Sequence, residues 1–254
     1  MNNPVILAEE KDQILTLTLN RPQAMNSFNF AQVEALSAQI EAVRFRPEIR
    51  VVILTGAGEK AFCVGADLKD FKVMSRDETI EWCMLGSSVF NAIARVPKVV
   101  VAAVNGYALG GGLELALACD FRIASENCAL GLPEVTLGWM PGWGGVKRLV
   151  ELIGPTRAKE MLMFGSRIKA GEALSLGILN RVVPLPDLIG AAREYAGRLC
   201  EKNPMSLAAI KLMLQEHGSA VDSRDSLLEA MTVSLLSKSD YAAGKIADFE
   251  NKRR

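Results

Sequence analysis

Two glutamates beside a run of three glycines are the residues of this sequence best suited to acid–base chemistry. Glu114 follows Gly110-Gly111-Gly112 closely, and Glu134 comes twenty residues later, directly after Pro133. Glycine lets the backbone approach a ligand closely, and the first residues of a helix offer unpaired N–H donors with a partial positive charge. This combination suits a site that holds an oxyanion and moves protons beside it.

Each of these features also has a purely structural interpretation. Glu114 lies in an otherwise apolar helical segment, where a buried carboxylate needs either a partner or a function because burying an unpaired charge is costly. Glu134 alone would be an ordinary exposed acid in a loop, and a glycine-rich turn alone would be structural. The functional interpretation therefore depends on the features occurring together.

Alternating strand-like and helix-like segments must position these residues. Apolar runs predict strands at 5–7, 14–19, 51–55 and 99–104, with residues 9–12 as the first connection. Helical patterns cover 31–44, capped by Ser27 or Asn29, and 79–94, and another helix begins at Leu113. Residues 61–71 read as a loop that runs into a short helix. The alternation predicts an α/β fold with right-handed crossovers.

From about residue 186 only helical patterns remain, at 188–201, 204–216, 226–236 and 241–251. We therefore expect a core domain over 1–190 and a helical region over 191–254, which covers the core or contacts another subunit.

Composition excludes several classes of function. Lysine plus arginine equals aspartate plus glutamate at 29 each, without a basic stripe, which argues against nucleic-acid or polybasic membrane partners. No apolar run approaches a membrane span, and the N-terminal residues lack a signal-peptide pattern. Five cysteines without a CxxC pair predict reduced core residues and a cytoplasmic protein. With His217 as the single histidine, at a predicted helix end, no metal site is expected.

Several motifs in a fixed order resemble those of the crotonase superfamily, the enoyl-CoA hydratase and isomerase group. The resemblance extends along nearly the whole chain and rests on Leu19-Asn20-Arg21-Pro22 with Asn26, Ala61 to Leu68, Asn105-Gly106, Gly110 to Glu114, Cys119-Asp120, Pro133-Glu134, Leu137-Gly138 and Pro141 to Gly145. It implies a spiral of repeated ββα units with a C-terminal helical oligomerisation region, assembled as a homotrimer or homohexamer.

The resemblance also implies roles for the central residues. The amides of Ala66 and Gly111 would form the oxyanion hole for a thioester carbonyl, and Glu114 and Glu134 would share one water beside the enoyl double bond. The implied activity is syn addition of water to a 2-trans-enoyl-CoA, which gives a 3-hydroxyacyl-CoA. Which glutamate activates the water stays open, since the pair can titrate as a unit.

The expected substrate-binding residues follow from the same match, with an acyl-CoA thioester as partner. Coenzyme A is part of the substrate, so no separate cofactor is implied. Gln23 replaces a lysine common in the family, and Gly142 stands where a dehalogenating branch has a nucleophilic aspartate. Trp139 and Trp143 replace small residues and either narrow the acyl pocket or pack elsewhere. The full set is Gln23, Ala24, Met25, Ala61, Gly65, Asp67, Leu68, Lys69, Trp139, Gly142 and Trp143. The tail Phe249 to Arg253 resembles family tails that reach the nucleotide, and it is equally consistent with the end of a plain amphipathic helix.

Two other functions stay open at this point. In a Δ3–Δ2 enoyl-CoA isomerase Glu114 would be dispensable, because several family isomerases keep only the second acid. A non-catalytic acyl-CoA-binding protein would need neither glutamate. The presence of both acids favours hydration.

Overall fold

Buried aliphatic strands form the centre of the computed structural model, which describes residues 4–215, 231, 240 and 244. Among them, a six-stranded sheet has the order β1 (Ile6–Lys11), β2 (Ile14–Leu19), β3 (Val51–Gly56), β5 (Val99–Val104), β7 (Phe121–Ser125) and β10 (Arg181–Val183). Only the β1–β2 pair is antiparallel. Every residue of β3 and β5 is buried, which explains their unbroken apolar runs.

A second sheet of short strands has the order β4 (Ala61–Cys63), β6 (Tyr107–Leu109), β8 (Ala129–Gly131) and β9 (Arg167–Lys169). The chain alternates between the sheets, since β3 leads to β4, β5 to β6 and β7 to β8, and a helix follows each pair. Each ββα unit thus adds one parallel strand to each sheet, and the predicted spiral is confirmed.

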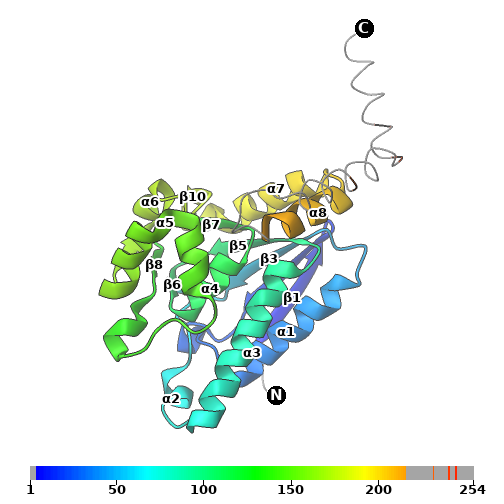
Figure 1. Ribbon diagram of the computed structural model, residues 1–254. Coiled ribbons are helices and arrows are strands. Elements are labelled where there is room, and N and C mark those ends of the chain that lie inside the picture. The colour runs from blue at the N-terminus through cyan, green and yellow to red at the C-terminus, as the bar shows by residue number, and fades with distance from the viewer. Residues whose placement is uncertain (1–3, 216–230, 232–239, 241–243, 245–254) are drawn as a thin grey trace.

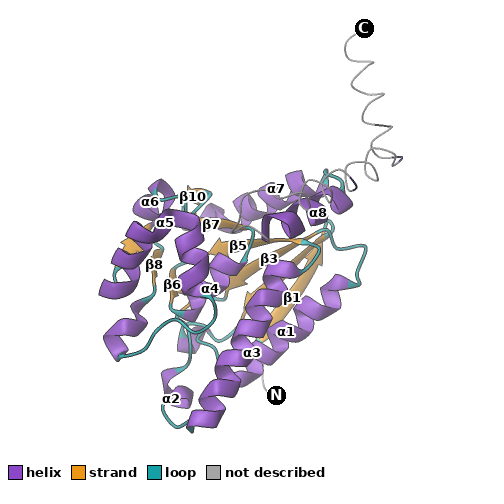
Figure 2. Ribbon diagram, in the orientation of Figure 1, coloured by secondary structure: helices purple, strands orange, loops and turns teal. Residues whose placement is uncertain are grey.

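Helices cover both faces of the larger sheet (Figures 1 and 2). Helices α1 (Phe30–Arg44) and α3 (Arg76–Arg95) lie side by side on one face, where alternate strand residues such as Val52 and Leu54 join their core. The intervening residues Val51 and Ile53 face α7 (Leu188–Cys200) on the other side. Of the two candidate caps, Asn29 caps α1, because its side chain accepts a 3.0 Å hydrogen bond from the Gln32 amide.

Two local expectations need correction. Residues 9–11 belong to β1 rather than to a connection, and the turn is Asp12-Gln13, both with positive φ. β1 is an edge strand exposed after Ile6, so its polar residues give no strand signal. Residues 61–63 form β4 instead of a loop, because a three-residue strand is too short to show a period.

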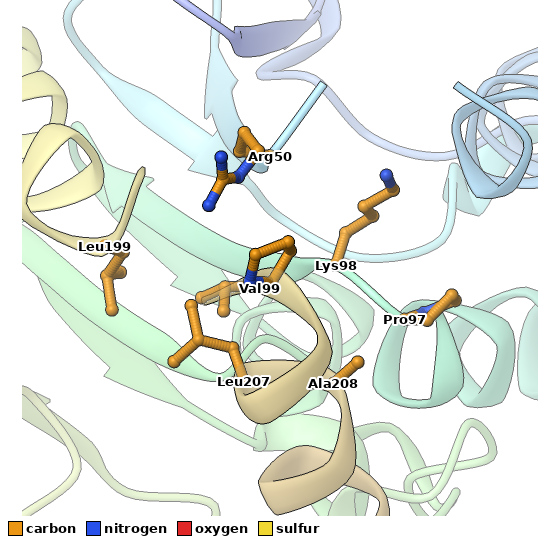
Figure 3. Close-up of a pocket in the computed structure, with 8 residues that line it drawn as sticks. Arg50, Pro97, Lys98, Val99, Leu199, Leu207 and Ala208 are labelled. Atoms are coloured by element: carbon orange, nitrogen blue, oxygen red, sulfur yellow. The ribbon is translucent and has the colours of Figure 1, made fainter. Parts of the chain in front are cut away.

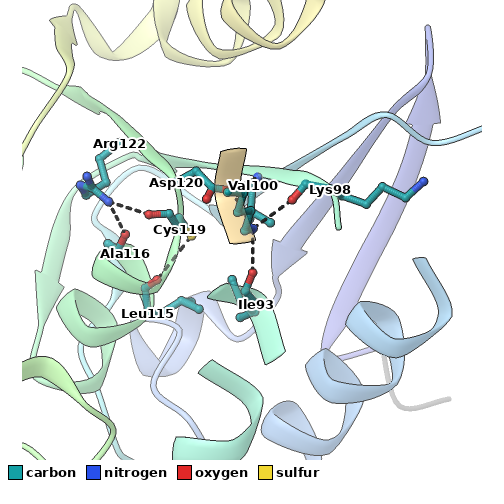
Figure 4. A network of polar contacts seen from close by, with 9 residues as sticks. Ile93, Lys98, Val100, Leu115, Ala116, Cys119, Asp120 and Arg122 are labelled. Atoms are coloured by element: carbon teal, nitrogen blue, oxygen red, sulfur yellow. Dashed lines mark hydrogen bonds and ion pairs between the residues drawn. The ribbon is translucent and has the colours of Figure 1, made fainter. Parts of the chain in front are cut away.

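Helix α4 (Gly111–Ala118) is buried along its whole length and carries Glu114. Its C-terminal end is satisfied by Arg122, whose guanidinium donates to the carbonyls of Ala116 at 3.2 Å and Cys119 at 2.7 Å (Figure 4). A cation at this end also complements the helix dipole. At the N-terminal end, the amide of Gly111 has no partner within the helix.

A buried ion pair fixes α8 (Pro204–Gln215) against the core beside α4. The Lys211 ammonium lies 2.8 Å from Asp120 and also donates to the carbonyls of Ile93 and Lys98. Asp120 also accepts a 2.7 Å hydrogen bond from the Val100 amide. All three ammonium protons are therefore used inside the fold.

Removing Lys211 should cost considerable stability. Lys211→Met leaves the Asp120 carboxylate without its cation. We therefore expect the free energy of unfolding to fall by ~3 kcal/mol, which is at the lower end of the range for removing one partner of a buried ion pair. Urea unfolding measures the change. Lys147→Met, on a side chain that is 84% exposed, serves as control and should change stability by less than ~0.5 kcal/mol. Equal unfolding midpoints for the two variants would contradict the assignment.

The C-terminal predictions are confirmed only in part. Helices α7 and α8 lie where the pattern placed them. The predicted helices 226–236 and 241–251, His217 and the tail Phe249 to Arg253 fall outside the described residues, apart from the single positions 231 and 244. The division into 1–190 and 191–254 stays a prediction; α7, which spans residue 190, packs on one face of the larger sheet.

Candidate active site

A cleft of about 980 Å³ opens where the N-terminus of α4 meets the segments after β4 and β8. It is lined by both glutamates, by Gly110 and Gly111, and by residues 64–71. A second hollow beneath α8, next to Arg50 and Lys98, measures about 10 Å³ and has room for about one water (Figure 3). Of these two spaces, only the cleft accommodates a coenzyme thioester.

One wall of the cleft presents the amide of Ala66. Its neighbours bind Phe28 on the opposite side: the Phe28 amide donates to the Gly65 carbonyl, and the Asp67 amide donates to the Phe28 carbonyl, each at 2.8 Å. Successive residues of an extended chain point in opposite directions, so the Ala66 N–H faces away from Phe28. No hydrogen bond from this amide occurs within residues 4–215.

The amide of Gly111 lies next to it. Gly111 is the first residue of α4, so its N–H has no partner within the helix. The preceding Gly110 has φ 53° and ψ −128°, a conformation that glycine alone adopts readily. A Cβ on Gly65 would lie 3.0 Å from the Gly111 nitrogen, which shows how closely the two segments approach. The result is a pair of neighbouring donors at the positive end of a helix.

Glu114 is 2% exposed and is held by the loop before α5 (Gly145–Phe164). Its Oε1 accepts hydrogen bonds from the amides of Trp143 and Gly145, both at 2.8 Å. Burial raises the pKa of Glu114, while these amides and the Arg148 guanidinium act in the opposite direction. The carboxyl group therefore has partners inside the protein as well as a place on the cleft wall.

Glu134 lies in the 3₁₀ helix η2 (Pro133–Leu137), on the same cleft. Its Oε2 is buried and has no hydrogen-bond partner among the described residues, and Oε1 lies 3.0 Å from the position of a Cβ built on Gly110. Burial and, to a smaller extent, the charge of Glu114 together raise the pKa of Glu134 to about 7. The carboxyl group is thus poised to exchange a proton near neutral pH.

The two tryptophans of the glycine-rich loop have different surroundings. Trp143 is 4% exposed and lines the cleft from an aromatic cluster, with its ring 5.2–5.6 Å from those of Phe28, Trp82 and Phe90. A Cβ on Gly86 or Gly111 would lie 2.3 or 2.4 Å from the indole, so the ring fits between two glycines. Trp139 is half-exposed at the cleft and contacts Phe71.

The expected coenzyme-binding segments meet on the lining of the cleft. Gln23, Ala24 and Met25 lie in and after η1 (Pro22–Ala24), while Asp67, Leu68 and Lys69 begin α2 (Leu68–Phe71). Arg21 joins the two segments through a 2.9 Å ion pair with Asp67.

Two of the remaining expected residues differ in their placement. Gly142 lines the cleft, where a Cβ would meet the Cys83 sulfur at 3.4 Å. Ala61 lies outside it, buried in β4, and its carbonyl accepts hydrogen bonds from Asn26 and Asn105. The structure therefore gives Ala61 a place in the scaffold instead.

Some lining residues were not anticipated from the sequence. They come from separate elements that the fold brings together: Arg21, Phe71, Cys83, Met140 and Arg167. Arg21 belongs to a family motif, but no local pattern marks the other four. Arg167 stands on β9, one of the strands too short for the sequence to indicate.

A ββα spiral with two free amides and two acids in one cleft defines a crotonase-type protein. The family model for enoyl-CoA hydratase/isomerase matches residues 9–254. The chain belongs to this family.

Individual relatives agree with the family match. A short-chain-enoyl-CoA hydratase of Clostridium acetobutylicum is 41% identical over 85% of this chain and 80% of its own. A crotonyl-CoA hydratase of Syntrophomonas wolfei is 37% identical over 98% of this chain and 96% of its own. A solved enoyl-CoA hydratase structure from Bacillus anthracis has a TM-score of 0.94 at 36% identity and covers 98% of this chain and 96% of that one.

The expected family and fold are thereby confirmed, and the chain is an enzyme of the enoyl-CoA hydratase family. Over the described part of the chain, no helix is long and apolar enough to cross a membrane. The roles of the individual site residues stay predictions.

Proposed function

We propose that the protein adds water syn across the double bond of a 2-trans-enoyl-CoA to give a 3-hydroxyacyl-CoA. The observation that carries this proposal is the unpartnered, buried Oε2 of Glu134, on the same cleft as Glu114 and the free amides of Ala66 and Gly111. A second acid with an unused oxygen has no structural explanation in the fold, and it is suited to hold a water or to move its proton.

Each group has a chemical task in this reaction. As water adds at Cβ, negative charge develops on the thioester oxygen, and the amides of Ala66 and Gly111 stabilise it. One carboxyl group accepts the proton of the water while the other delivers a proton to Cα. Because both carboxyl groups line the same cleft, the water and the proton can add to the same face of the double bond, as syn addition requires. Either glutamate can take either role.

Comparing two assays on the purified protein tests the proposal. Incubation with crotonyl-CoA should lower the absorbance of the conjugated thioester until hydration reaches equilibrium, whereas a Δ3-enoyl-CoA should show little double-bond shift. Dominant isomerisation would favour the second enzymatic function, and binding without turnover would indicate a non-catalytic protein.

The pH dependence of hydration should identify Glu134. Because the pKa of Glu134 is raised to about 7, we expect an inflection of the rate near pH 7. The rate falls above this pH if Glu134 donates the proton to Cα, and below it if Glu134 accepts the proton of water. The residual activity of Glu134→Gln should lack the inflection, and a variant that retains it would show that another group titrates there.

We also propose a preference for short acyl groups. The Trp143 indole occupies space beside Gly111 that a small residue would leave open, and two relatives are named for short-chain and crotonyl substrates. Trp143→Ala should raise the kcat/KM of a 2-octenoyl-CoA relative to crotonyl-CoA by about tenfold or more. Because both kcat/KM values are measured on the same variant, a loss of folded protein lowers them equally and leaves their ratio unchanged. Trp139→Ala is the comparison at the exposed indole, and an unchanged ratio in Trp143→Ala would argue against the pocket role.

The remaining expectations belong to the same proposal. Gln23 to Met25 and Asp67 to Lys69 would hold the coenzyme part of the substrate, which makes a separate cofactor unnecessary. We propose a cytoplasmic homotrimer or homohexamer built through the C-terminal helices. The exposed apolar side chains of α8 support this assembly: Met205, Ile210, Leu212 and Leu214.

A further inference from the structure

Arg148, in the first turns of α5, contacts the loop that holds Glu114. Its Nη1 donates to the Trp143 carbonyl at 2.8 Å, and its Nη2 donates to Asn91 on α3 at 2.6 Å. A Cβ on Gly144 would lie 2.5 Å from Nη1, and Gly144 has φ 93°, so glycine is required for the guanidinium to lie over this loop.

Trp143 connects the guanidinium to the carboxylate. Its carbonyl accepts from Arg148, while its amide donates to Oε1 of Glu114 at 2.8 Å. Movement of the guanidinium would therefore displace the loop whose amides hold Glu114. Arg148 itself is not among the residues that line the cleft.

The charges around Glu114 single out the same arginine. Glu134 on η2 and Cys83 on α3 carry negative charge when ionised, and each interacts electrostatically with Glu114. Of the described groups that influence the pKa of Glu114, Arg148 is the one that carries a positive charge. The guanidinium in turn interacts with Cys119 and Glu151, and it is half-buried, which reduces screening by solvent.

We propose that Arg148 is a positioning residue for Glu114: it fixes the Gly142–Gly145 loop through the Trp143 carbonyl, and its charge favours the ionised carboxylate. This proposal rests on the proposed function, because it assigns Arg148 to a carboxyl group that handles a proton in hydration. The arginine acts through the loop and contacts neither water nor substrate.

The test combines kinetics with a titration that needs no activity. The variants Arg148→Gln, Arg148→Lys and Asn91→Ala are compared with wild type in crotonyl-CoA hydration across pH. The Glu114 carboxyl is titrated by ¹³C NMR in the free proteins, and Glu114→Gln identifies its signal. Arg148→Gln should lower kcat by roughly 10- to 100-fold with little change in KM, the scale of a catalytic group displaced by about 1 Å. Its Glu114 titration should move to higher pH, because the cation that favours the carboxylate is lost.

The other variants separate charge from geometry. Arg148→Lys keeps the positive charge, so Glu114 should titrate as in the wild-type protein. It should retain only part of the wild-type kcat, because lysine lacks the forked donors of arginine. Asn91→Ala should leave the titration unchanged and lower kcat less than Arg148→Gln does. If Arg148→Gln does not fold, unchanged kcat in both remaining variants overturns the proposal.

Two outcomes distinguish failure of this inference from failure of the proposed function. A folded Arg148→Gln protein whose Glu114 titrates as in wild type overturns the role of Arg148. Absence of hydration by the wild-type protein overturns the proposed function, while the NMR titration still decides whether Arg148 controls Glu114.

Discussion

Glu114→Gln and Glu134→Gln should each lower the rate of crotonyl-CoA hydration by about 10²-fold or more, the scale of general acid–base catalysis. Glutamine keeps the size of each side chain and loses the ability to exchange a proton. At Glu114 the amide oxygen can still accept from Trp143 and Gly145, so the loop should stay in place. Stopped assays of crotonyl-CoA loss measure the effect.

The comparison variant is Glu126→Gln, on an exposed acid between β7 and β8. It should retain the wild-type rate. The double variant should lose less than the product of the two single losses, because groups that act as a unit are not additive. A near-wild-type hydration rate in either single variant would remove that residue from the mechanism.

Gly111→Ala should reduce kcat by about 10²- to 10³-fold, as expected for the loss of one oxyanion donor. The new Cβ would lie 2.4 Å from the Trp143 ring, so the first turn of α4 or the indole must move. Movement of the helix turn changes the distance between the Gly111 amide and the thioester oxygen, whereas movement of the indole alone leaves the amide in place. Steady-state kinetics with crotonyl-CoA test this.

Two further alanines make the result specific. Gly86→Ala presses on the same indole from α3, at 2.3 Å, without altering the Gly111 backbone, and should cost less. Gly171→Ala enters open space on α6 (Ala170–Ser175) and should leave kcat unchanged. Equal losses in Gly86→Ala and Gly111→Ala would assign the effect to the indole rather than to the donor.

The sequence predicts four of the six strands of the larger sheet, and it does so best for β3 and β5, which are buried on both faces and therefore read as continuous apolar runs. It does not predict β7 and β10. The smaller sheet escapes prediction from the residue pattern, since β4, β6, β8 and β9 contain three residues each. The resemblance to a family supplies the spiral that local patterns leave undefined.

The residues of the candidate site are likewise predictable from the sequence only in part. Glu114 stands out as an acid in an apolar helix, so its burial is predictable. The burial of Glu134 depends on segments far apart in sequence, and the positions of Cys83 and Arg148 depend on how α3 and α5 pack. Ala61 shows the opposite case, because a place in a family motif does not distinguish a cleft residue from one that supports the scaffold.

A crystal structure of Glu134→Gln with crotonyl-CoA bound tests the central claim most directly. We predict that the thioester oxygen lies about 2.7–3.1 Å from the nitrogens of both Ala66 and Gly111. A single water should lie between Glu114 and the side chain at position 134, next to Cβ of the acyl group. A thioester oxygen bound away from these amides, or two side chains on opposite faces of the double bond, would contradict the mechanism.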